Sequence, residues 1–395
     1  MSDVVSLHKA EYGQQPDVVT SAPGVVNLIG AHTESTDGYL MLFGMNRRAH
    51  VAASLRTDSS IRFFAADLNE RKRTSTSALK YRQEDRFAGI TKGVVSRLQT
   101  VGAHIRGVNV TITSEIPSGI GLGCSQAIGV ALTTALAMLF DLDVEPIEVA
   151  QIAHYVEHSY EGLPVGLAEF IASAVAKRDH FLFIDTHRLD WTHIRADLAG
   201  GSFVGVNTYA PSALTPAEEA SRQAECSNCL EIVAGHRNGC SFQDYTLSEM
   251  ASRIGDLPGA ARRYCLHIVT ENERVLSCRA ALGRRDIDRL GKLLTESHES
   301  LRDLYEGTTP EVDWLVKHAL TVPGVTGARL AGGSTGTCAL ILGKADVSAC
   351  LGDLTQEYEH IFGFHPHIFT LAPEDGVRVD YGGVREGIAD QRRRY

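Results

Sequence analysis

The sequence of 395 residues predicts an α+β fold. Strand-like alternation and helix-like patterns are mixed along the chain, without the strict strand–helix–strand repetition of a parallel α/β sheet. A glycine-rich loop at 117–127 joins a strand-like stretch to a helix-like one. After about residue 210 long helical patterns dominate, so we expect two domains, residues 1–210 and 211–395.

The composition is that of a globular protein and argues against several classes. Hydrophobic residues make up 44% of the chain and charged residues 22%. The net charge of −10 disfavours a nucleic-acid partner. No apolar run reaches the roughly 18 residues of a membrane span, and residues 1–14 are polar, unlike a signal peptide. We therefore expect a cytoplasmic protein without a membrane partner, whose eight cysteines are reduced thiols.

The first part of the chain predicts strands around a polar loop. Residues 17–30 predict a strand, a turn at Pro23-Gly24 and a second strand. The polar stretch 31–38 follows directly, and loops in such places often carry ligand-contacting side chains, although an ordinary connection is the alternative. Residues 49–66 alternate as strands, and 87–101 have the pattern of an amphipathic helix.

The glycine-rich loop, PSGIGLGCSQA at 117–127, predicts a phosphate site. A strand-like stretch at 108–114 precedes it, and an Ala-rich, helix-like stretch at 128–139 follows. Glycines allow backbone N–H groups to turn toward a ligand, and a helix N-terminus adds partial positive charge. The loop is not a Walker A motif, because no Lys-Ser/Thr follows its last glycine. The alternative is a purely structural turn.

The rest of the chain predicts helices with a few strands. The elements expected in order are a helix at 149–159, a further segment that begins within 162–175, a turn and strand at 179–185, a strand at 203–207, helices within 216–320, a second glycine-rich turn entering a strand at 327–342, a helix at 348–362 and a strand at 367–371. The helix at 149–159 carries Glu157, and the segment at 162–175 carries Glu169.

A cysteine cluster raises the question of a metal site. Cys226, Cys229, His236 and Cys240 lie within fifteen residues and could bind zinc. Their spacing is not a common zinc pattern, and the first two lie on a helical run. We therefore expect these residues to be ordinary helix and loop residues without zinc.

Three motifs in order, and a fourth segment, resemble those of a known kinase family. Residues 23–34, PGVVNLIGAHTE, resemble the galactokinase signature PGRVNLIGEHTD. The loop at 117–127 resembles the phosphate loop of GHMP kinases, and 327–338 resemble their third motif. The segment 298–306, HESLRDLYE, is similar to a galactokinase segment. The resemblance extends from Glu11 to about Val377 and indicates the galactokinase branch of the GHMP kinases.

The resemblance implies a two-lobed α+β fold with a ribosomal-S5-like N-terminal lobe and a ferredoxin-like C-terminal lobe. It also implies that ATP and Mg²⁺ are the cofactors and that the active site lies between the lobes. Carried over by position, the ATP-binding residues are Pro117, Gly119, Gly121, Gly123, Cys124 and Ser125. Ser125 and Glu157 are implied as the Mg²⁺ ligands, and their hydroxyl and carboxylate are hard oxygen donors.

On the acceptor side, the resemblance implies that His32, Glu34 and Gly166 bind the sugar and that Glu169 is the catalytic carboxylate. Glu169 stands where galactokinases have an Asp, and a carboxylate at this position can accept the hydroxyl proton.

Several acceptor-side positions depart from the galactokinase pattern. Val25 replaces an Arg, Ala31 replaces a Glu, and Glu34 replaces an Asp. The Tyr that galactokinases place against the sugar aligns near Ala217. The loss of polar groups predicts a larger and less polar pocket, in which galactose loses hydrogen bonds.

These expectations combine into a function. We expect an ATP-dependent sugar kinase that phosphorylates a hydroxyl, in the family the anomeric one, of a sugar other than galactose, such as a larger or modified sugar or a sugar phosphate. The alternatives are a catalytically impaired sensor that binds ATP and a sugar, and a different ATP-dependent chemistry. The expected partner is a small sugar, and the expected state is a monomer or a homodimer.

Overall fold

The computed structural model describes residues 2–235, 241–249, 255, 257–332 and 336–382. In this part of the chain one sheet has eight strands, β1 (Val18–Ile29), β2 (Tyr39–Leu55), β3 (Ser60–Ala65), β4 (Glu70–Ser75), β5 (Val108–Ser114), β6 (His180–Asp185), β7 (Asp190–Arg195) and β12 (Arg378–Gly382). A second sheet has four strands, β8 (Ser202–Asn207), β9 (Val325–Leu330), β10 (Cys338–Gly343) and β11 (His367–Leu371). The predicted α+β class is confirmed.

The two sheets differ in strand order and in strand direction. The large sheet runs β12-β1-β2-β5-β3-β4, with β6 paired to the other end of β2 and β7 paired to β6. Its pairs are antiparallel except for β3 with β5. The small sheet runs β11-β8-β10-β9 and is antiparallel throughout.

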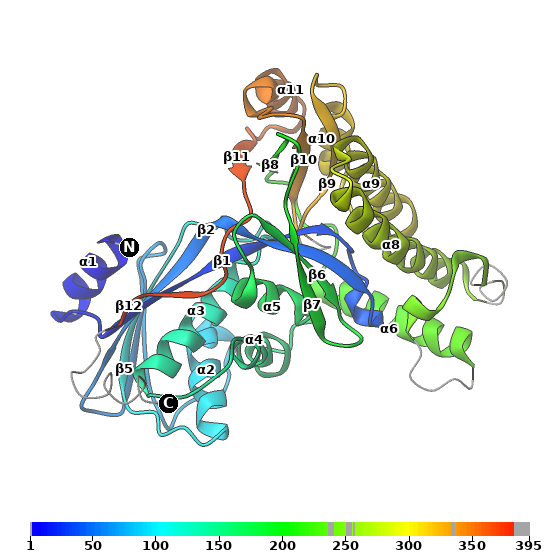
Figure 1. Cartoon of the computed structure of the whole chain (residues 1–395). Coiled ribbons are helices and arrows are strands. Elements are labelled where there is room, and N and C mark those ends of the chain that lie inside the picture. The colour runs from blue at the N-terminus through cyan, green and yellow to red at the C-terminus, as the bar shows by residue number, and fades with distance from the viewer. Residues whose placement is uncertain (1, 236–240, 250–254, 256, 333–335, 383–395) are drawn as a thin grey trace, which may run out of the picture.

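The helices cover both sheets. They are α1 (Ser2–Tyr12), α2 (Ala88–Thr100), α3 (Cys124–Leu139), α4 (Pro146–Tyr155), α5 (Ala168–Val175), α6 (Pro216–Ala234), α8 (Gly259–Gly283), α9 (Ile287–Ser300), α10 (Pro310–Ala319) and α11 (Gly352–Phe362). Short helical segments include the 3-10 turns η1 (Glu34–Thr36), η2 (Gln83–Asp85), η4 (Phe242–Asp244) and η7 (Ser348–Leu351), and the π-helical turns η3 (Val156–Tyr160) and η6 (Leu301–Tyr305). Figure 1 shows α2, α3, α4 and α5 together on one side of the large sheet. In the same view α8, α9 and α10 lie beside the small sheet.

The polar N-terminal segment, for which the sequence predicted no element, forms helix α1. Its buried residues are Val4, which packs against Val19 and Ala52 of the large sheet, and His8. The His8 ring hydrogen-bonds the hydroxyls of Ser54 (2.8 Å) and Thr111 (3.0 Å). Because side chains alternate along a strand, α1 covers the sheet face opposite to α3. The apolar cluster beneath this helix is small, which explains why its sequence pattern was weak.

The predicted turn at Pro23-Gly24 is wrong, because β1 continues through it as one strand. The pairing of β1 with β2 changes register between Pro23 and Val25. Pro23 has no N–H to give to a ladder, and the Val25 N–H donates instead to the Leu122 carbonyl at 3.0 Å. The irregularity is therefore a bulge that attaches the glycine loop to β1.

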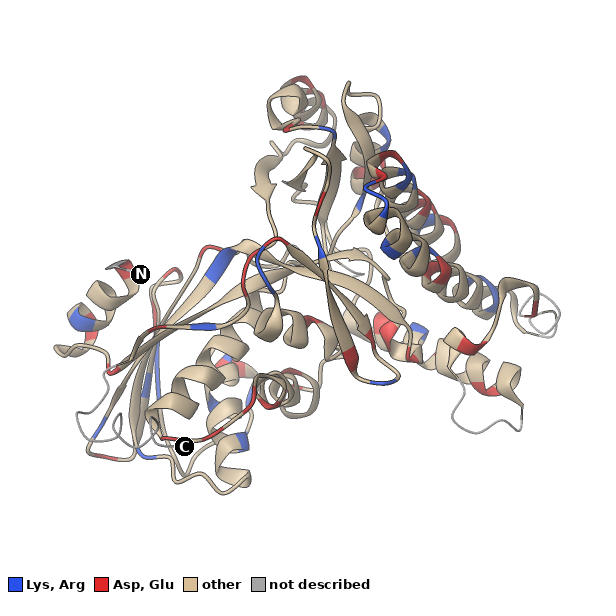
Figure 2. Cartoon of the chain, in the orientation of Figure 1, with Lys and Arg blue, Asp and Glu red and all other residues tan. Residues whose placement is uncertain are grey.

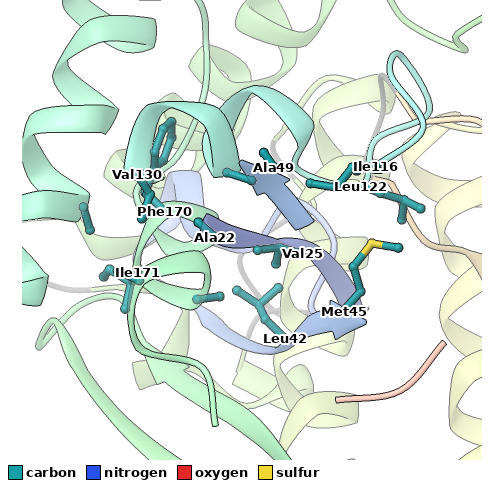
Figure 3. Close-up of a cluster of buried hydrophobic side chains, with 14 of the residues drawn as sticks. Ala22, Val25, Leu42, Met45, Ala49, Ile116, Leu122, Val130, Phe170 and Ile171 are labelled. Carbon is teal, nitrogen blue, oxygen red and sulfur yellow. The ribbon is translucent and has the colours of Figure 1, made fainter. Parts of the chain in front are cut away.

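The core below this strand is apolar and closely packed. Figure 3 shows Ala22, Val25 and Leu42 together with Val130 of α3 and Phe170 of α5. All five side chains are fully buried. Strand β1 is buried along its whole length, which explains why its sequence reads as a nearly continuous apolar run.

Sheet membership crosses the expected domain division at residue 210. Strand β8 precedes that point but pairs with β10 and β11 in the small sheet. Strand β12 comes near the end of the chain but returns to pair with β1 (Figure 1). If the chain were divided by its two sheets, the first lobe would end after β7 and would also include β12. The boundary at residue 210 stays a prediction.

The charged residues of the long helices lie as expected for solvated surfaces. Figure 2 shows acidic and basic residues interspersed along α8 and α9, which is typical of solvated helix faces. Among the described helices, none combines the length and the apolar content that a membrane span requires.

Cys226 and Cys229 are buried on α6, and the Cys229 thiol approaches the Ala261 carbonyl of α8. His236 and Cys240 lie outside the described residues, so the absence of zinc stays a prediction.

Candidate active site

A cavity of about 1250 Å³ brings the candidate residues together. Its walls are the glycine loop, the segment after β1, the segment before α5 and the first turns of α6. The residues named from the sequence that line it are His32, Glu34, Pro117, Gly119, Gly121, Gly123, Cys124, Ser125, Glu157, Gly166 and Glu169. These come from four separate parts of the chain, and the fold places all of them around one space.

The glycine loop forms its wall with backbone. Gly121 has a φ of 78°, which favours glycine. A Cβ at Gly121 would lie 2.4 Å from the Gly332 carbonyl oxygen. The Thr337 N–H donates to the Ile120 carbonyl at 3.2 Å, so the third motif packs against the phosphate loop. Helix α3 begins at Cys124, immediately after the loop. Its N-terminus and the loop together can hold phosphate.

Ser125 and Glu157 fit a hard metal ion. Glu157 is 3% exposed, and its Oε1 makes no hydrogen bond to the described residues. Its Oε2 accepts from the Gln126 amide at 3.2 Å, and the Ser125 hydroxyl donates to the other end of that amide at 3.2 Å. Burial raises the pKa of Glu157 to about 8. A buried carboxylate oxygen without a partner, beside a hydroxyl, is a suitable donor set for Mg²⁺.

Glu34 and Glu169 lie close to each other at the start of α5. Glu34 Oε1 accepts the Ala168 N–H at 2.8 Å, and a Cβ at Gly166 would lie 2.0 Å from Glu34 Oε2. Gly166 therefore makes room for the Glu34 carboxylate. Burial raises the pKa of Glu34 to about 6. Burial, with the added negative charge of Glu34, raises the pKa of Glu169 to about 7.

His32 has a partner that the sequence did not reveal. Its Nδ1 lies 3.0 Å from Glu219 Oε1 on α6, and its ring stacks on Tyr305 with centroids 4.1 Å apart. Glu219 and Gln223 both line the cavity, and the Gln223 amide donates to Glu219 Oε1 at 3.0 Å. Glu219 and Gln223 are four residues apart and therefore lie on the same face of α6. This spacing is the signal in the sequence that could have indicated which side of α6 faces the cavity.

The segment that carries His32 is held from the C-terminal lobe. Glu271 of α8 accepts the N–H groups of Gly30 (2.9 Å) and Ala31 (3.2 Å) and the Ser297 hydroxyl (2.6 Å). The Arg274 guanidinium donates to its other oxygen at 2.7 Å. Burial acts to raise the pKa of Glu271, but the neighbouring guanidinium groups outweigh it and lower that pKa. Glu271 is thus a buried, fully engaged carboxylate that joins the lobes.

Of the residues that depart from the galactokinase pattern, not all lie at the cavity, contrary to what the sequence had led us to expect. Val25 is fully buried in the core and does not line the cavity (Figure 3). Ala31 lines the cavity, whereas Ala217 is exposed and does not. The expected enlargement of the pocket at Val25 and Ala217 is therefore wrong, because α6 turns a different face, that of Glu219, toward the cavity.

The charge of the cavity is one-sided. The acidic and histidine side chains among its described lining residues are Glu34, Glu157, Glu169, Glu219, His32, His154 and His158. No Lys or Arg is among the described residues that line it. Among the described lining residues, positive charge for a bound nucleotide can come from backbone dipoles and the histidines, and a bound metal ion would add to it.

A phosphate loop and a carboxylate pair in a cleft between two α+β lobes define a GHMP-type kinase. Family models agree: GHMP kinases N terminal domain matches 89–177, GHMP kinases C terminal matches 278–360, and the galactokinase galactose-binding signature matches 6–55. A galactokinase of Thermosipho africanus is 32% identical over 90% of this chain and 98% of that protein. A galactokinase of a Roseiflexus species is 32% identical over 93% of this chain and 94% of that protein.

Solved structures give the same result. The structure of Lactococcus lactis galactokinase complexed with galactose has a TM-score of 0.90 and 26% identity, covering 95% of this chain and 99% of that one. A mevalonate kinase with a TM-score of 0.64 and 18% identity shares the fold. The chain belongs to the galactokinase branch of the GHMP kinase superfamily. It is a galactokinase-like sugar kinase, and its family uses ATP. The match to the galactose-binding signature gives no support to the expectation of an acceptor other than galactose.

Proposed function

We propose that this protein transfers the γ-phosphoryl group of ATP to the anomeric hydroxyl of a neutral sugar, with galactose among its acceptors. One observation carries the proposal: the glycine loop, the Ser125–Glu157 pair and the Glu169 carboxylate line one cavity. The galactose-binding signature and the likeness to a galactokinase that binds galactose support galactose as an acceptor.

The nucleotide end supplies charge neutralisation without basic side chains. The N–H groups of the loop and the N-terminus of α3 would offer partial positive charge to the phosphates of a bound nucleotide. Ser125 and Glu157 would hold Mg²⁺, which neutralises charge on the phosphates when it is bound. Phosphoryl transfer depends mostly on positioning and on such neutralisation, so the missing Arg at Val25 is compatible with turnover.

Glu169 is the proposed general base. A base is most effective when its pKa lies near the working pH, and the pKa of Glu169 is raised to about 7. Part of this increase comes from the charge of Glu34, whose carboxylate is held on the Ala168 N–H. Glu34 therefore has two roles in the proposal: it positions the start of α5, and it makes its neighbour a stronger base.

The charge of the cavity selects among acceptors. A sugar phosphate would bring negative charge next to Glu34 and Glu169, with no Lys or Arg among the described lining residues to balance it. This disfavours the sugar phosphate that the sequence had left open. Neutral sugars, including larger or modified ones, bring no such repulsion, and carboxylates accept hydrogen bonds from their hydroxyls.

The test is a substrate panel. Purified protein is incubated with ATP, Mg²⁺ and galactose, other neutral sugars or sugar phosphates, ADP release is measured, and the product is identified by NMR. We expect ADP release with galactose or another neutral sugar and a sugar 1-phosphate as product. Absence of sugar-dependent ADP release across the panel would overturn the proposal, and so would a preference for sugar phosphates.

A second candidate function is that of an ATP and sugar sensor, and the cavity without described Lys or Arg favours it. Such a protein would show a raised melting temperature with ATP·Mg²⁺ and sugar but no ADP release. The same panel, read by thermal shift, separates the two functions. The cytoplasmic location and the monomeric or dimeric state stay predictions.

A further inference from the structure

We propose that Glu219 is the positioning residue of the acceptor site and that it orients His32 so that the Nε2 of His32 faces the sugar. The inference rests on the proposed function, because it concerns the acceptor end of the same cavity. Of this pair, the sequence motifs pointed only to His32. Glu219 lies on a helix in the other half of the chain.

The pair is buried and close. His32 Nδ1 lies 3.0 Å from Glu219 Oε1, and the two side chains are 5% and 6% exposed. Both residues line the cavity. The Nε2 atom of His32 makes no hydrogen bond to the described residues. A buried ring nitrogen without a partner costs free energy unless a ligand or water satisfies it, so this atom is available to a sugar hydroxyl.

The His32 ring and the backbone that carries it are constrained on several sides. The His32 backbone has a φ of 63°, which is unusual for a residue with a side chain. The ring stacks on Tyr305 at an interplanar angle of 15°. The preceding residue, Ala31, is fixed through its N–H by Glu271 and through its carbonyl by His267 at 3.1 Å. A strained backbone that is fixed on several sides is typical of a functional position.

The Glu219 carboxylate determines which ring nitrogen carries the proton. An ionised carboxylate can only accept, so Nδ1 must be the donor. In the neutral ring Nε2 then presents a lone pair to a sugar hydroxyl, and in the protonated ring it donates instead. The titratable groups that contact the ring are Glu219 on α6, His267 on α8 and Tyr305 on η6. Of the neighbouring charged groups, Arg222 lies over the ring of Tyr305, and Glu34 on η1 lines the same cavity.

The test compares Glu219→Gln with Glu231→Gln, the same change at an exposed position of the same helix. The amide introduced by Glu219→Gln removes the charge but keeps the size of the side chain. We expect KM for the sugar to rise at least about tenfold, KM for ATP to stay within about twofold, and the pH dependence of the sugar KM to change. The control should match the unaltered protein. Equal sugar KM values in the two variants would overturn the proposal.

Two further measurements separate positioning from a loss of folding and from a failure of the proposed function. In ¹⁵N-histidine NMR, the unaltered protein should show His32 protonated at Nδ1, and Glu219→Gln should change this signal. A signal that is the same in both proteins overturns the proposal, even where no sugar is phosphorylated. In the double variant His32→Gln with Glu219→Gln, we expect the effects on sugar binding to be much less than additive, whereas full additivity contradicts the pairing.

Discussion

The phosphate wall and the acceptor wall of the cavity differ in what they are made of. The phosphate wall is the loop at 117–123, whose Gly119, Gly121 and Gly123 have no side chain, and the first turn of α3. The acceptor wall is made of charged and polar side chains, namely those of His32, Glu34, Glu169 and Glu219, from three separate segments. A wall built on glycines depends on backbone conformation, so we expect it to tolerate changes in the side chains beside them. A wall of side chains depends on each charged group and on the residues that hold it in position. A single substitution can therefore change which acceptor such a wall binds.

The largest expected effect is on the support of the acceptor wall. Glu271→Gln removes a buried carboxylate beside Arg329 and Arg274, which leaves a buried guanidinium without its counter-charge. We expect the free energy of unfolding to fall by about 3 kcal/mol. Chemical denaturation measures it. A loss below about 1 kcal/mol would show that the amide alone holds the segment at Gly30 and Ala31.

The next effect tests the chemistry of the acceptor wall. We expect Glu169→Gln to lower turnover by about 10²-fold or more while ATP still binds, because the amide cannot accept the hydroxyl proton. Steady-state kinetics and ATP binding measure the two parts. Nearly full activity would mean that another group, or none, acts as the base.

A smaller effect is expected for the conformation of the phosphate wall. In Gly121→Ala the new Cβ would meet the Gly332 carbonyl, and we expect ATP affinity to fall about tenfold. Gly162→Ala is the matched control, because Gly162 has a similar φ of 77° but nothing within 4 Å of its Cβ position. Calorimetric ATP titration gives both values. Equal losses in the two variants would attribute the effect to backbone strain alone.

The last expected effect is a pH dependence of stability in the metal-free protein. The pKa values of Glu34, Glu169 and Glu157 are raised to about 6, 7 and 8 from the ordinary 4.5. The stability that protonation provides is therefore fully present below pH 4.5 and is lost as the pH rises toward 8. We expect Tm to fall less over this range in Glu157→Gln than in the unaltered protein. Identical slopes would contradict the raised pKa of Glu157.

Local pattern in the sequence determined much of this protein. The α+β class and the glycine loop between a strand and a helix were readable, because each depends on neighbours in the chain. The candidates Ser125, Glu157 and Glu169 came from the resemblance to the kinase family, by position in its motifs. The candidate residues of both walls converge on one cavity.

Only the tertiary structure decided the rest. It made β1 continuous through Pro23-Gly24, because Leu122 accepts the Val25 N–H. It placed Val25 in the core, away from the cavity, and it turned Glu219 toward His32 across 187 positions of the chain. It also held the His32 segment on Glu271. The physical reason is the same in each case: the deciding partner is far away in sequence, and no local periodicity records which distant group satisfies a buried polar atom.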